Sequence, residues 1–262
     1  MKTIVINVNP VAFTVASFEI GWGFIIAVLA AVLALLFFVD VAKSRKFKDN
    51  TIITLCVLIP LCGFIGAYLF GVIENLLFFH KIYPIISSSM RAYGLFLGAV
   101  VAGQIYVRIT RISLWQLADS GIPCLILFMA VYRVGCVLVG CCYGIPSDLP
   151  WAVVYTNPGT IAPLGMAIHP TQLYHFVWNV IVFVAVWVSR KRFHTAGLLG
   201  LLALILYSVG DFAIRFFRGD EPSLTYVTLS QITGIGIVVV SVYLFVLRVK
   251  TAGRRQEVDT VT

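Results

Sequence analysis

Charged residues interrupt the long apolar stretches that make up most of this sequence. Arg133 lies near the end of one stretch, and Asp211, Arg215 and Arg218 lie near the end of another. A charge at the centre of a membrane-spanning helix costs about 2.5 to 3.5 kcal/mol, so such residues usually line a polar site. Guanidinium groups bind phosphate oxygens through paired hydrogen bonds and stay charged at any relevant pH. The cluster therefore predicts a site for a phosphate-bearing ligand, with an anionic phospholipid headgroup as the nearest candidate.

An internal ion pair is the alternative for part of this cluster. Asp211, Arg215 and Arg218 follow one another at i, i+4 and i+7, which places them on one face of a helix. Asp211 and Arg215 would then pair, and Arg218 would extend to the membrane surface. Both interpretations stay open for Arg215 and Arg218. Arg133 has no acidic residue within its own helical turn, so only one of the three arginines has an obvious acidic neighbour.

Composition places these residues in an all-α membrane protein. The 262 residues are 60% hydrophobic and 11% charged, whereas soluble domains carry about 25% charged residues. Continuous apolar runs of about 20 residues cross a bilayer as helices and exclude the alternating strands of a barrel. We predict a single seven-helix membrane domain over 1–250 and a disordered cytoplasmic tail over 251–262. The predicted spans are 18–39, 51–73, 92–107, 115–138, 172–189, 196–217 and 227–247.

The net charge of +8 indicates membrane orientation and not nucleic-acid binding. Most lysines and arginines fall on alternate connections between the predicted spans. Positively charged loops stay in the cytoplasm, which predicts an N-terminus outside and a C-terminus in the cytoplasm. Binding of the same basic residues to anionic lipid headgroups is compatible with this orientation. These residues are Lys43, Arg45, Lys46, Lys48, Arg108, Arg111, Arg190, Lys191, Arg192, Arg248, Lys250, Arg254 and Arg255.

This orientation brings polar groups from several helix ends to one level at the outer face. Arg133 and Cys136 are three residues apart and share a helical face. The connection 139–169, rich in Pro and Gly, predicts an outer arm that caps the site and binds a partner. The remaining groups at this level are Trp22, Glu74, Asn75, Arg91, Tyr93 and the segment HPTQLYH over 169–175.

A stripe of small residues marks the third predicted span. Gly94, Gly98 and Ala102 recur every four residues, which lets a neighbouring helix approach closely. We expect a role in helix packing. The alternative for Gly94 and Gly98 is that they open space for an acyl chain.

The chain resembles the prolipoprotein diacylglyceryl transferase family almost from end to end. The resemblance implies a seven-helix enzyme of the bacterial plasma membrane, with its site near the outer leaflet. It implies transfer of a diacylglyceryl group from phosphatidylglycerol to the lipobox cysteine of an exported prolipoprotein, which forms a thioether and releases glycerol phosphate. We expect no cofactor. The segments that carry the resemblance are SLWQLADSGIPC, YRVGCVLVGCCYG over 132–144, HPTQLY, YSVGDFAIRFFRGD and LSQITG.

The resemblance also implies roles for individual residues. The arginines would stabilise the negative charge that builds on the departing phosphate. His169 would assist the acceptor thiol, whose free pKa is about 8.5; the alternative is that it only caps the helix that follows Pro170. The expected catalytic residues are Arg133, His169, Tyr93 and Arg218. The expected substrate-binding residues are Gly94, Cys136, Cys141, Gln172, Tyr174, Asp211, Arg215 and Gln231.

Several positions depart from the family pattern. Cys136 stands at the first asparagine of the family signature, Cys141 at its glutamate, and Tyr93 at a histidine. Asp211 and Arg215 stand where the family has an arginine and a glutamate, a charge swap that preserves an ion pair. We therefore expect phosphate handling to be retained and proton transfer and acceptor recognition to differ.

Three cysteines lie at the predicted outer face: Cys136, Cys141 and Cys142. Zinc sites favour Cys-x-x-Cys spacing, and an adjacent pair gives poor ligand geometry, so we predict no metal. A disulfide in an oxidising compartment and a reactive thiol that carries a transferred group are the alternatives. The other cysteines, Cys56, Cys62 and Cys124, are expected as small apolar residues within spans.

Two classes of function remain open. The first is the diacylglyceryl transferase, or a divergent paralogue that acts on another acceptor. The second is a non-catalytic phospholipid-binding membrane protein of the same fold. Release of glycerol phosphate by the purified protein separates them.

Overall fold

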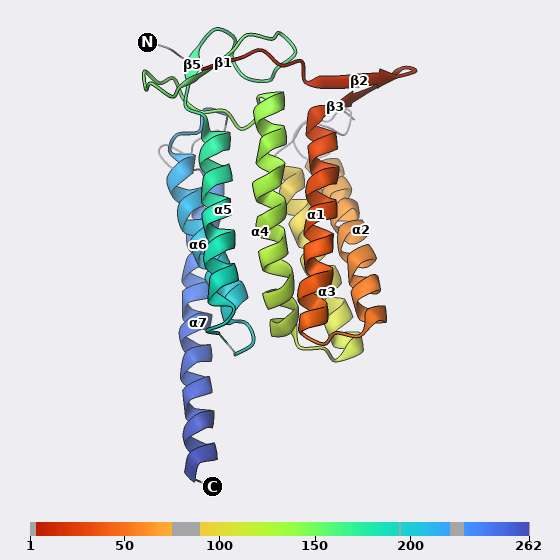
Figure 1. Cartoon of the computed structure of the whole chain (residues 1–262), viewed down its shortest axis with the longest axis vertical. Coiled ribbons are helices and arrows are strands. Elements are labelled where there is room, and N and C mark those ends of the chain that lie inside the picture. Colours follow the sequence, from red (N-terminus) through yellow and green to blue (C-terminus); the bar gives the residue numbers. More distant parts are fainter. Residues whose placement is uncertain (1–3, 75–89, 194, 221–227, 262) are drawn as a thin grey trace. The chain divides into compact units, whose positions relative to one another are not determined.

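The computed structural model describes residues 4–74, 90–193, 195–220 and 228–261 (Figure 1). The chain forms two compact units. One comprises residues 1–37 and 119–262, and the other comprises 38–118. The helices are α1 (Trp22–Ser44), α2 (Asp49–Glu74), α3 (Met90–Thr110), α4 (Leu114–Val139), α5 (Thr171–Ser189), α6 (Leu198–Arg215) and α7 (Leu229–Val261). The single domain predicted over 1–250 stays a prediction.

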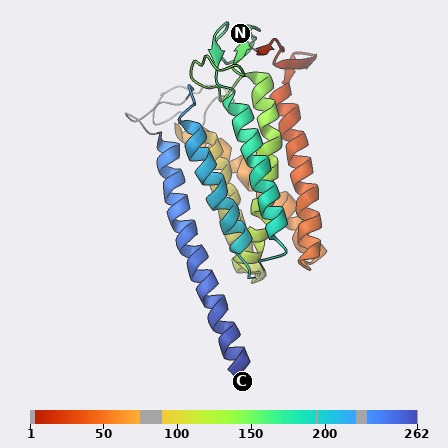
Figure 2. The ribbon, with the colours of Figure 1, turned by 60° about the vertical axis from the view of Figure 1, so that its left-hand side comes forward.

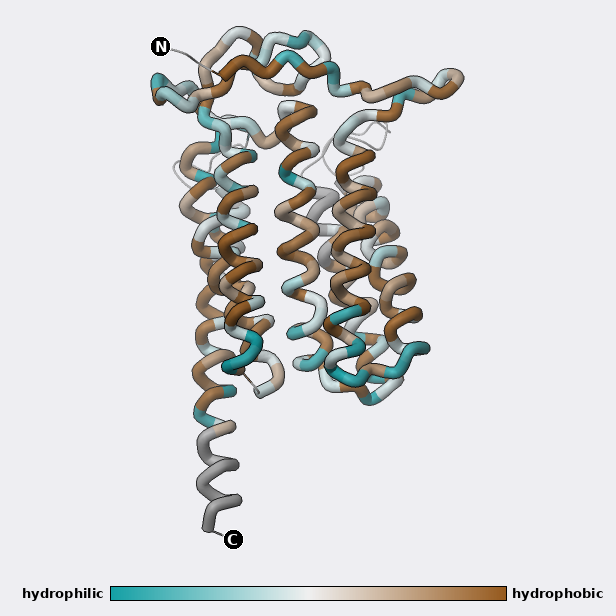
Figure 3. The backbone as a smooth tube through the Cα atoms, in the orientation of Figure 1, coloured by the Kyte–Doolittle hydropathy of each residue, from teal (hydrophilic) through white to brown (hydrophobic). Residues whose placement is uncertain are grey.

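The described residues confirm a mostly helical membrane protein, which also contains short strands outside the helices. Each predicted span overlaps one helix, and six helices of the described residues are long and apolar enough to cross a membrane. In the third helix, α3, the apolar stretch Leu97–Thr110 is shorter than those six spans. Hydrophobic residues dominate the middle of the helices, and hydrophilic residues gather at their ends (Figure 3). A seventh span and the orientation of the termini stay predictions.

Two predicted boundaries are wrong. Residues 18–21, predicted as the start of the first span, form the strand β3 (Phe18–Gly21), which pairs with β2 (Val11–Val15) in an antiparallel hairpin. Hydropathy alone does not distinguish an apolar strand from a helix. At the other end of the chain, α7 continues to Val261, so the tail predicted as disordered is helical over 251–261. Extending an existing helix needs no new nucleation, and Arg, Gln and Glu favour helix.

The unit of residues 38–118 is built on a close contact between α2 and α3. A Cβ atom added at Gly94 would collide with the backbone oxygen of Gly66, and one at Gly98 with that of Cys62. The small-residue stripe therefore packs the two helices together, as predicted. A role of Gly94 in binding an acyl chain stays a prediction.

In the other unit, α4, α5 and α6 share an apolar core. Asp119, 2% exposed, anchors the start of α6 to α4. Its carboxylate accepts hydrogen bonds from the backbone N–H groups of Gly197 at 2.8 Å and Gly200 at 2.9 Å. This satisfies donors that a helix start leaves unpaired, and it places a negative charge at the positive end of the helix. The core residues are Ile126, Val182, Val186, Leu199 and Ala203.

The connection after α4 folds into a cap. It contributes β4 (Val153–Tyr155) and β5 (Ala167–Ile168), which join β1 (Ile4–Ile6) in a sheet ordered β1-β4-β5. The sheet lies beyond the ends of α4 and α5 (Figure 2). Tyr155 is fully buried, and its hydroxyl donates to the carbonyl of Val137 in α4 at 2.9 Å. The predicted arm is therefore tied to the helix end that carries Arg133 and Cys136.

Candidate active site

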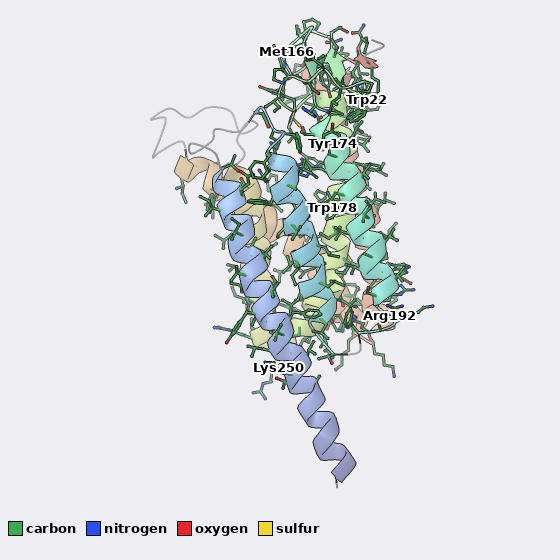
Figure 4. All side chains as sticks on the ribbon, turned by 90° about the vertical axis from the view of Figure 1, so that its left-hand side faces the viewer. Trp22, Met166, Tyr174, Trp178, Arg192 and Lys250 are labelled. Carbon is green, nitrogen blue, oxygen red and sulfur yellow. The ribbon has the colours of Figure 1, made fainter. Side chains whose placement is uncertain are left out.

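The end of α4, the start of α5 and the end of α6 bring most of the predicted site residues together in one unit. The cap covers this end, where Tyr174 lies (Figure 4). Arg192 and Lys250 lie at the opposite end of the same unit (Figure 4). The residues gathered here are Arg133, Cys136, Cys141, Cys142, His169, Gln172, Tyr174, His175, Asp211, Arg215 and Arg218.

Arg133 is a buried cation without a carboxylate partner in the described part of the chain. Its residue is 7% exposed. Its charge interacts with the Cys136, Cys142 and Tyr207 side chains and is opposed by the charge of Arg218. A buried charge is stable only when it is paired or hydrogen-bonded. The arrangement suits an incoming anion, and the predicted role of Arg133 in binding phosphate stays a prediction.

Asp211 and Arg215 form the ion pair predicted from their i, i+4 spacing. The Arg215 Nε donates to Asp211 Oδ2 at 2.5 Å, and the two side chains are 12% and 10% exposed. The other carboxylate oxygen, Oδ1, lies 3.6 Å from Nδ1 of His175. The ion-pair interpretation is thus confirmed for Arg215.

Arg218 differs from the prediction in two ways. The helix α6 ends at Arg215, so Arg218 lies in the turn beyond it and not on the predicted helical face. It also pairs with Asp220, to which Nε donates at 2.9 Å and a terminal guanidinium nitrogen at 2.8 Å. The expectation that only one of the three arginines has an acidic partner is therefore wrong. A spacing of i, i+7 places two residues on one face only when both lie in the same continuous helix.

His169 belongs to a hydrogen-bonded chain of three side chains. The Trp151 indole Nε1 donates to the Tyr174 hydroxyl at 2.9 Å, and this hydroxyl lies 3.1 Å from His169 Nδ1. An indole N–H only donates. The Tyr174 hydroxyl accepts from Trp151, so its own O–H is used when it donates to His169 Nδ1. Nδ1 is then an acceptor, and the His169 proton lies on Nε2. No side chain caps the start of α5 at Pro170, so the predicted capping by His169 is wrong.

Gln172 and Gln231 bind backbone groups. The Gln172 amide, 1% exposed, donates to the carbonyl of Cys141 at 2.8 Å. The Gln231 amide donates to the Phe212 carbonyl at 3.1 Å, and its oxygen accepts from the Thr228 N–H at 2.8 Å. Gln172 thus holds the turn after α4, and Gln231 ties the start of α7 to α6. Their predicted contacts with substrate stay predictions.

The three outer cysteines converge. Every pair of their Sγ atoms lies within 4.8 Å, and all three thiols are free. Hydrogen bonds from the Cys136 and Cys141 thiols, with the charges of Arg133 and Arg218, hold the pKa of the Cys142 thiol well below its usual range. Hydrogen bonds with the Cys136 and Cys142 thiols, together with burial, raise the pKa of the Cys141 thiol. Cys142 is therefore the first of the three to become a thiolate.

A cluster of three buried polar side chains lies between α5 and α6, and one of them, Asn179, was missed by the sequence analysis. Both ring nitrogens of His175, both amide atoms of Asn179 and one oxygen of Asp211 have no hydrogen-bond partner among the described residues. His175 and Asn179 are both fully buried. Buried polar groups without protein partners are normally satisfied by ordered water or a ligand. Their i, i+4 spacing on one helical face was the available signal.

The structure does not describe the Tyr93 side chain. Tyr93 belongs to the first turn of α3, in the unit of residues 38–118, and so does Gly94. Their place in the predicted site stays a prediction. The Glu74 and Arg91 side chains and Asn75 also lie outside the described part of the chain.

Comparisons with known proteins identify relatives along nearly the whole chain. A family profile described as "Prolipoprotein diacylglyceryl transferase" matches residues 10–247. A protein of Dehalococcoides mccartyi is 30% identical over 260 residues, which cover 98% of this chain and 99% of the relative. A protein of Clostridium tetani is 28% identical over 245 residues, with 90% and 96% covered. A third, from Listeria welshimeri, is 29% identical over 248 residues, with 92% and 90% covered. All three relatives bear the name phosphatidylglycerol–prolipoprotein diacylglyceryl transferase.

Proposed function

Because the chain belongs to the prolipoprotein diacylglyceryl transferase family and is a transferase of lipoprotein biosynthesis, we propose a specific reaction for it. The donor is phosphatidylglycerol, and the acceptor is the lipobox cysteine of an exported prolipoprotein. The acceptor sulfur attacks the glyceryl carbon that carries the phosphate. A C–S bond forms, the C–O bond to the phosphate breaks, and glycerol phosphate leaves with the electron pair.

The observation that carries this proposal is Arg133, which is buried near Arg218 and has no carboxylate partner among the described residues. Negative charge builds on the departing phosphate, so cations held in place beforehand stabilise the transition state more than the ground state. Arg133 is oriented by α4 before the lipid arrives, which removes the cost of reorganisation. The pair of Arg218 with Asp220 orients the Arg218 guanidinium beside it.

The chain of Trp151, Tyr174 and His169 supports a donor role for His169. With its proton on Nε2, a neutral His169 donates a hydrogen bond from that nitrogen and cannot accept a proton there. We therefore assign His169 to a phosphate oxygen and not to the acceptor thiol. Tyr93 stays in the proposed catalytic set, at the position of the family's histidine.

A groove between α6 and α7 suits an acyl chain of the donor. Its apolar lining lies next to Gln231, which joins these two helices, and therefore close to the end of α6 that carries Asp211. Apolar side chains with few polar groups are typical of lipid sites. The lining residues are Ser208, Val209, Phe212, Gly234, Ile235, Val238 and Val239.

The proposed location is the bacterial plasma membrane, with the site near the outer leaflet. The basic residues Arg192 and Lys250 lie at the end of their unit opposite to Tyr174 (Figure 4). Positively charged ends stay in the cytoplasm. The site would then face outside, where the exported acceptor emerges, and the N-terminus would be outside with the C-terminus in the cytoplasm.

The test uses the full chain in lipid nanodiscs that contain phosphatidylglycerol, together with a lipobox peptide. We expect release of glycerol phosphate and a peptide that gains the mass of a diacylglyceryl group. Arg133→Ala should lower the rate by about 10²- to 10³-fold, the cost of removing a preorganised charge donor. Arg192→Ala, at the opposite end, is the matched control and should retain the wild-type rate.

Phospholipid binding without transfer is the second candidate function. The cysteines at 136 and 141, where the family signature has an asparagine and a glutamate, favour it. Binding of phosphatidylglycerol with no product from any thiol peptide would support it and contradict the transferase reaction. Transfer to other thiols but not to a lipobox peptide would instead indicate a divergent paralogue with another acceptor.

A further inference from the structure

Cys136, Cys141 and Cys142 bring three sulfur atoms to one place beside the proposed phosphate site. Every pair of Sγ atoms lies within 4.8 Å, and Cys136 is 2% exposed. The sequence argued against a metal because neighbouring side chains usually point apart. Cys142, however, adopts a φ of 56°, in the left-handed region. In this turn the two adjacent thiols reach the same place as Cys136, which removes the objection.

The geometry suits a small thiophilic cation. Zinc binds thiolate sulfur at about 2.3 Å, so a tetrahedral site places its sulfur atoms about 3.8 Å apart. The three Sγ atoms therefore need to approach one another by about 1 Å or less to complete such a site. Thiolate ligands select zinc or Cu(I) among the common metals. Zinc has no redox chemistry, and in catalytic sites it keeps three protein ligands and one open position.

We propose that Cys136, Cys141 and Cys142 bind one zinc ion as three thiolates, and that the acceptor cysteine takes the fourth position. This proposal rests on the transferase function proposed above, because that reaction consumes a thiol. It assigns the three cysteines the task of activating the acceptor. Nothing in the family resemblance or in the names of the relatives assigns a metal to these positions.

The reaction follows from known zinc chemistry. A thiol that binds zinc loses its proton, which here passes to solvent. The resulting thiolate sulfur forms the C–S bond to the glyceryl carbon, and the C–O bond breaks with its electron pair going to the phosphate. The product is a thioether, which carries no charge and binds zinc more weakly than a thiolate. It therefore leaves the metal, and the fourth position becomes free for the next acceptor.

The surroundings of the cysteines support this assignment. Four thiolates around a divalent ion carry a net charge of −2, and the charges of Arg133 and Arg218 both act on Cys142. The backbone of the turn is also held from α5. Thr171 Oγ1 donates to the Cys142 carbonyl at 2.6 Å, and Gln172 donates to the Cys141 carbonyl at 2.8 Å. Such outer contacts orient the ligands of metal sites.

The experiment measures metal binding separately from lipid transfer. The full chain is purified in detergent under reducing conditions, incubated with zinc and freed of excess metal. Elemental analysis should find one zinc ion per chain. Single changes of Cys136, Cys141 and Cys142 to serine should each remove most of it, and the control Cys56→Ser, in α2, should retain it. Size-exclusion profiles of all variants establish that the loss of metal is not a loss of folding.

Cobalt in place of zinc gives a second test that needs no variant of the enzyme. Sulfur-to-cobalt charge-transfer absorption should appear on binding and strengthen when a lipobox peptide supplies a fourth thiolate. The same peptide with serine in place of cysteine should leave the spectrum unchanged. These spectra report on the metal and its ligands whether or not any lipid is transferred.

Three outcomes would overturn the zinc site: no bound zinc with all thiols free, a disulfide among the three cysteines in the active enzyme, or zinc that persists in Cys142→Ser. Full transfer activity after complete removal of zinc would overturn the proposal that zinc activates the acceptor and would leave the transferase function intact. The reverse result is distinct. Zinc bound by the three cysteines, with a cobalt spectrum that responds to the peptide but no lipid transfer, would support the site and contradict the proposed reaction.

Discussion

Exchanging the charges of Asp211 and Arg215 tests how the site balances its cations. The two atoms of the pair are 2.5 Å apart, and the side chains are 10% and 12% exposed. With an effective dielectric of about 20, two unit charges at that distance attract by about 7 kcal/mol before the cost of dehydrating them. Removing one member of a buried pair costs about 3 to 5 kcal/mol, because the other charge is left uncompensated. The net effect is therefore large enough to measure.

The test is a double-mutant cycle. Asp211→Arg and Arg215→Glu should each lower the free energy of unfolding in detergent by about 3 to 5 kcal/mol. Combined, they restore one positive and one negative charge in the reverse order, which the family resemblance implies at these positions, so the double variant should be more stable than the sum of the two losses by about 3 kcal/mol. The coupling between neighbours in such cycles reaches about 3 kcal/mol. Single variants within about 0.5 kcal/mol of the wild type, or a double variant as unstable as the sum of the two, would refute this account.

Two further predictions concern residues that position others. Asp119→Ala should lower the free energy of unfolding by about 3 kcal/mol, since two hydrogen bonds to a charged acceptor are lost. Asp148→Ala, at an exposed position, is the control. Equal losses of stability in the two variants would contradict the anchoring role of Asp119. Tyr174→Phe should replace the single Nε2–H tautomer of His169 by a mixture, seen in ¹⁵N NMR shifts of labelled histidine, with His175 as the internal reference. An Nδ1–H tautomer in the wild type would refute the proposed direction of that hydrogen bond.

The sequence predicted those parts of the fold that depend on the length of apolar runs. A continuous run of about 20 apolar residues has few alternatives to a helix in a membrane, so all seven helices of the described residues were predicted. The prediction failed where local pairing decided the structure. Phe18–Gly21 runs directly into the apolar helix that follows, and its pairing with β2 makes it a strand. Segment 251–261 is polar enough to be disordered alone, yet it continues a helix that already exists.

In the candidate site, too, contacts inside one helix could be predicted from the sequence, and contacts that depend on turns or on the cap could not. The Asp211–Arg215 pair was predictable because i, i+4 spacing fixes the geometry inside one helix. The pair of Arg218 with Asp220 was not, because a turn and not a helix brings them together. The contact of Trp151 with Tyr174 spans 23 positions and a folded cap, so no local pattern indicates it. The convergence of the three thiols depends on the left-handed conformation of Cys142, which is unusual for a residue other than glycine.

These observations assign different tasks to the two arginines that the sequence treated alike. Arg218 already has a bidentate carboxylate partner, so a phosphate would have to compete with Asp220 for the same guanidinium edge. Arg133 has no such partner in the described chain and interacts with the thiol cluster. We therefore propose that Arg133 binds the leaving phosphate directly and that Arg218 contributes its charge from a fixed position. If the three cysteines also hold zinc, the charge of Arg133 acts on the thiolate cluster as well as on the leaving phosphate. Its positive charge then favours the approach of two negatively charged groups that would otherwise repel each other.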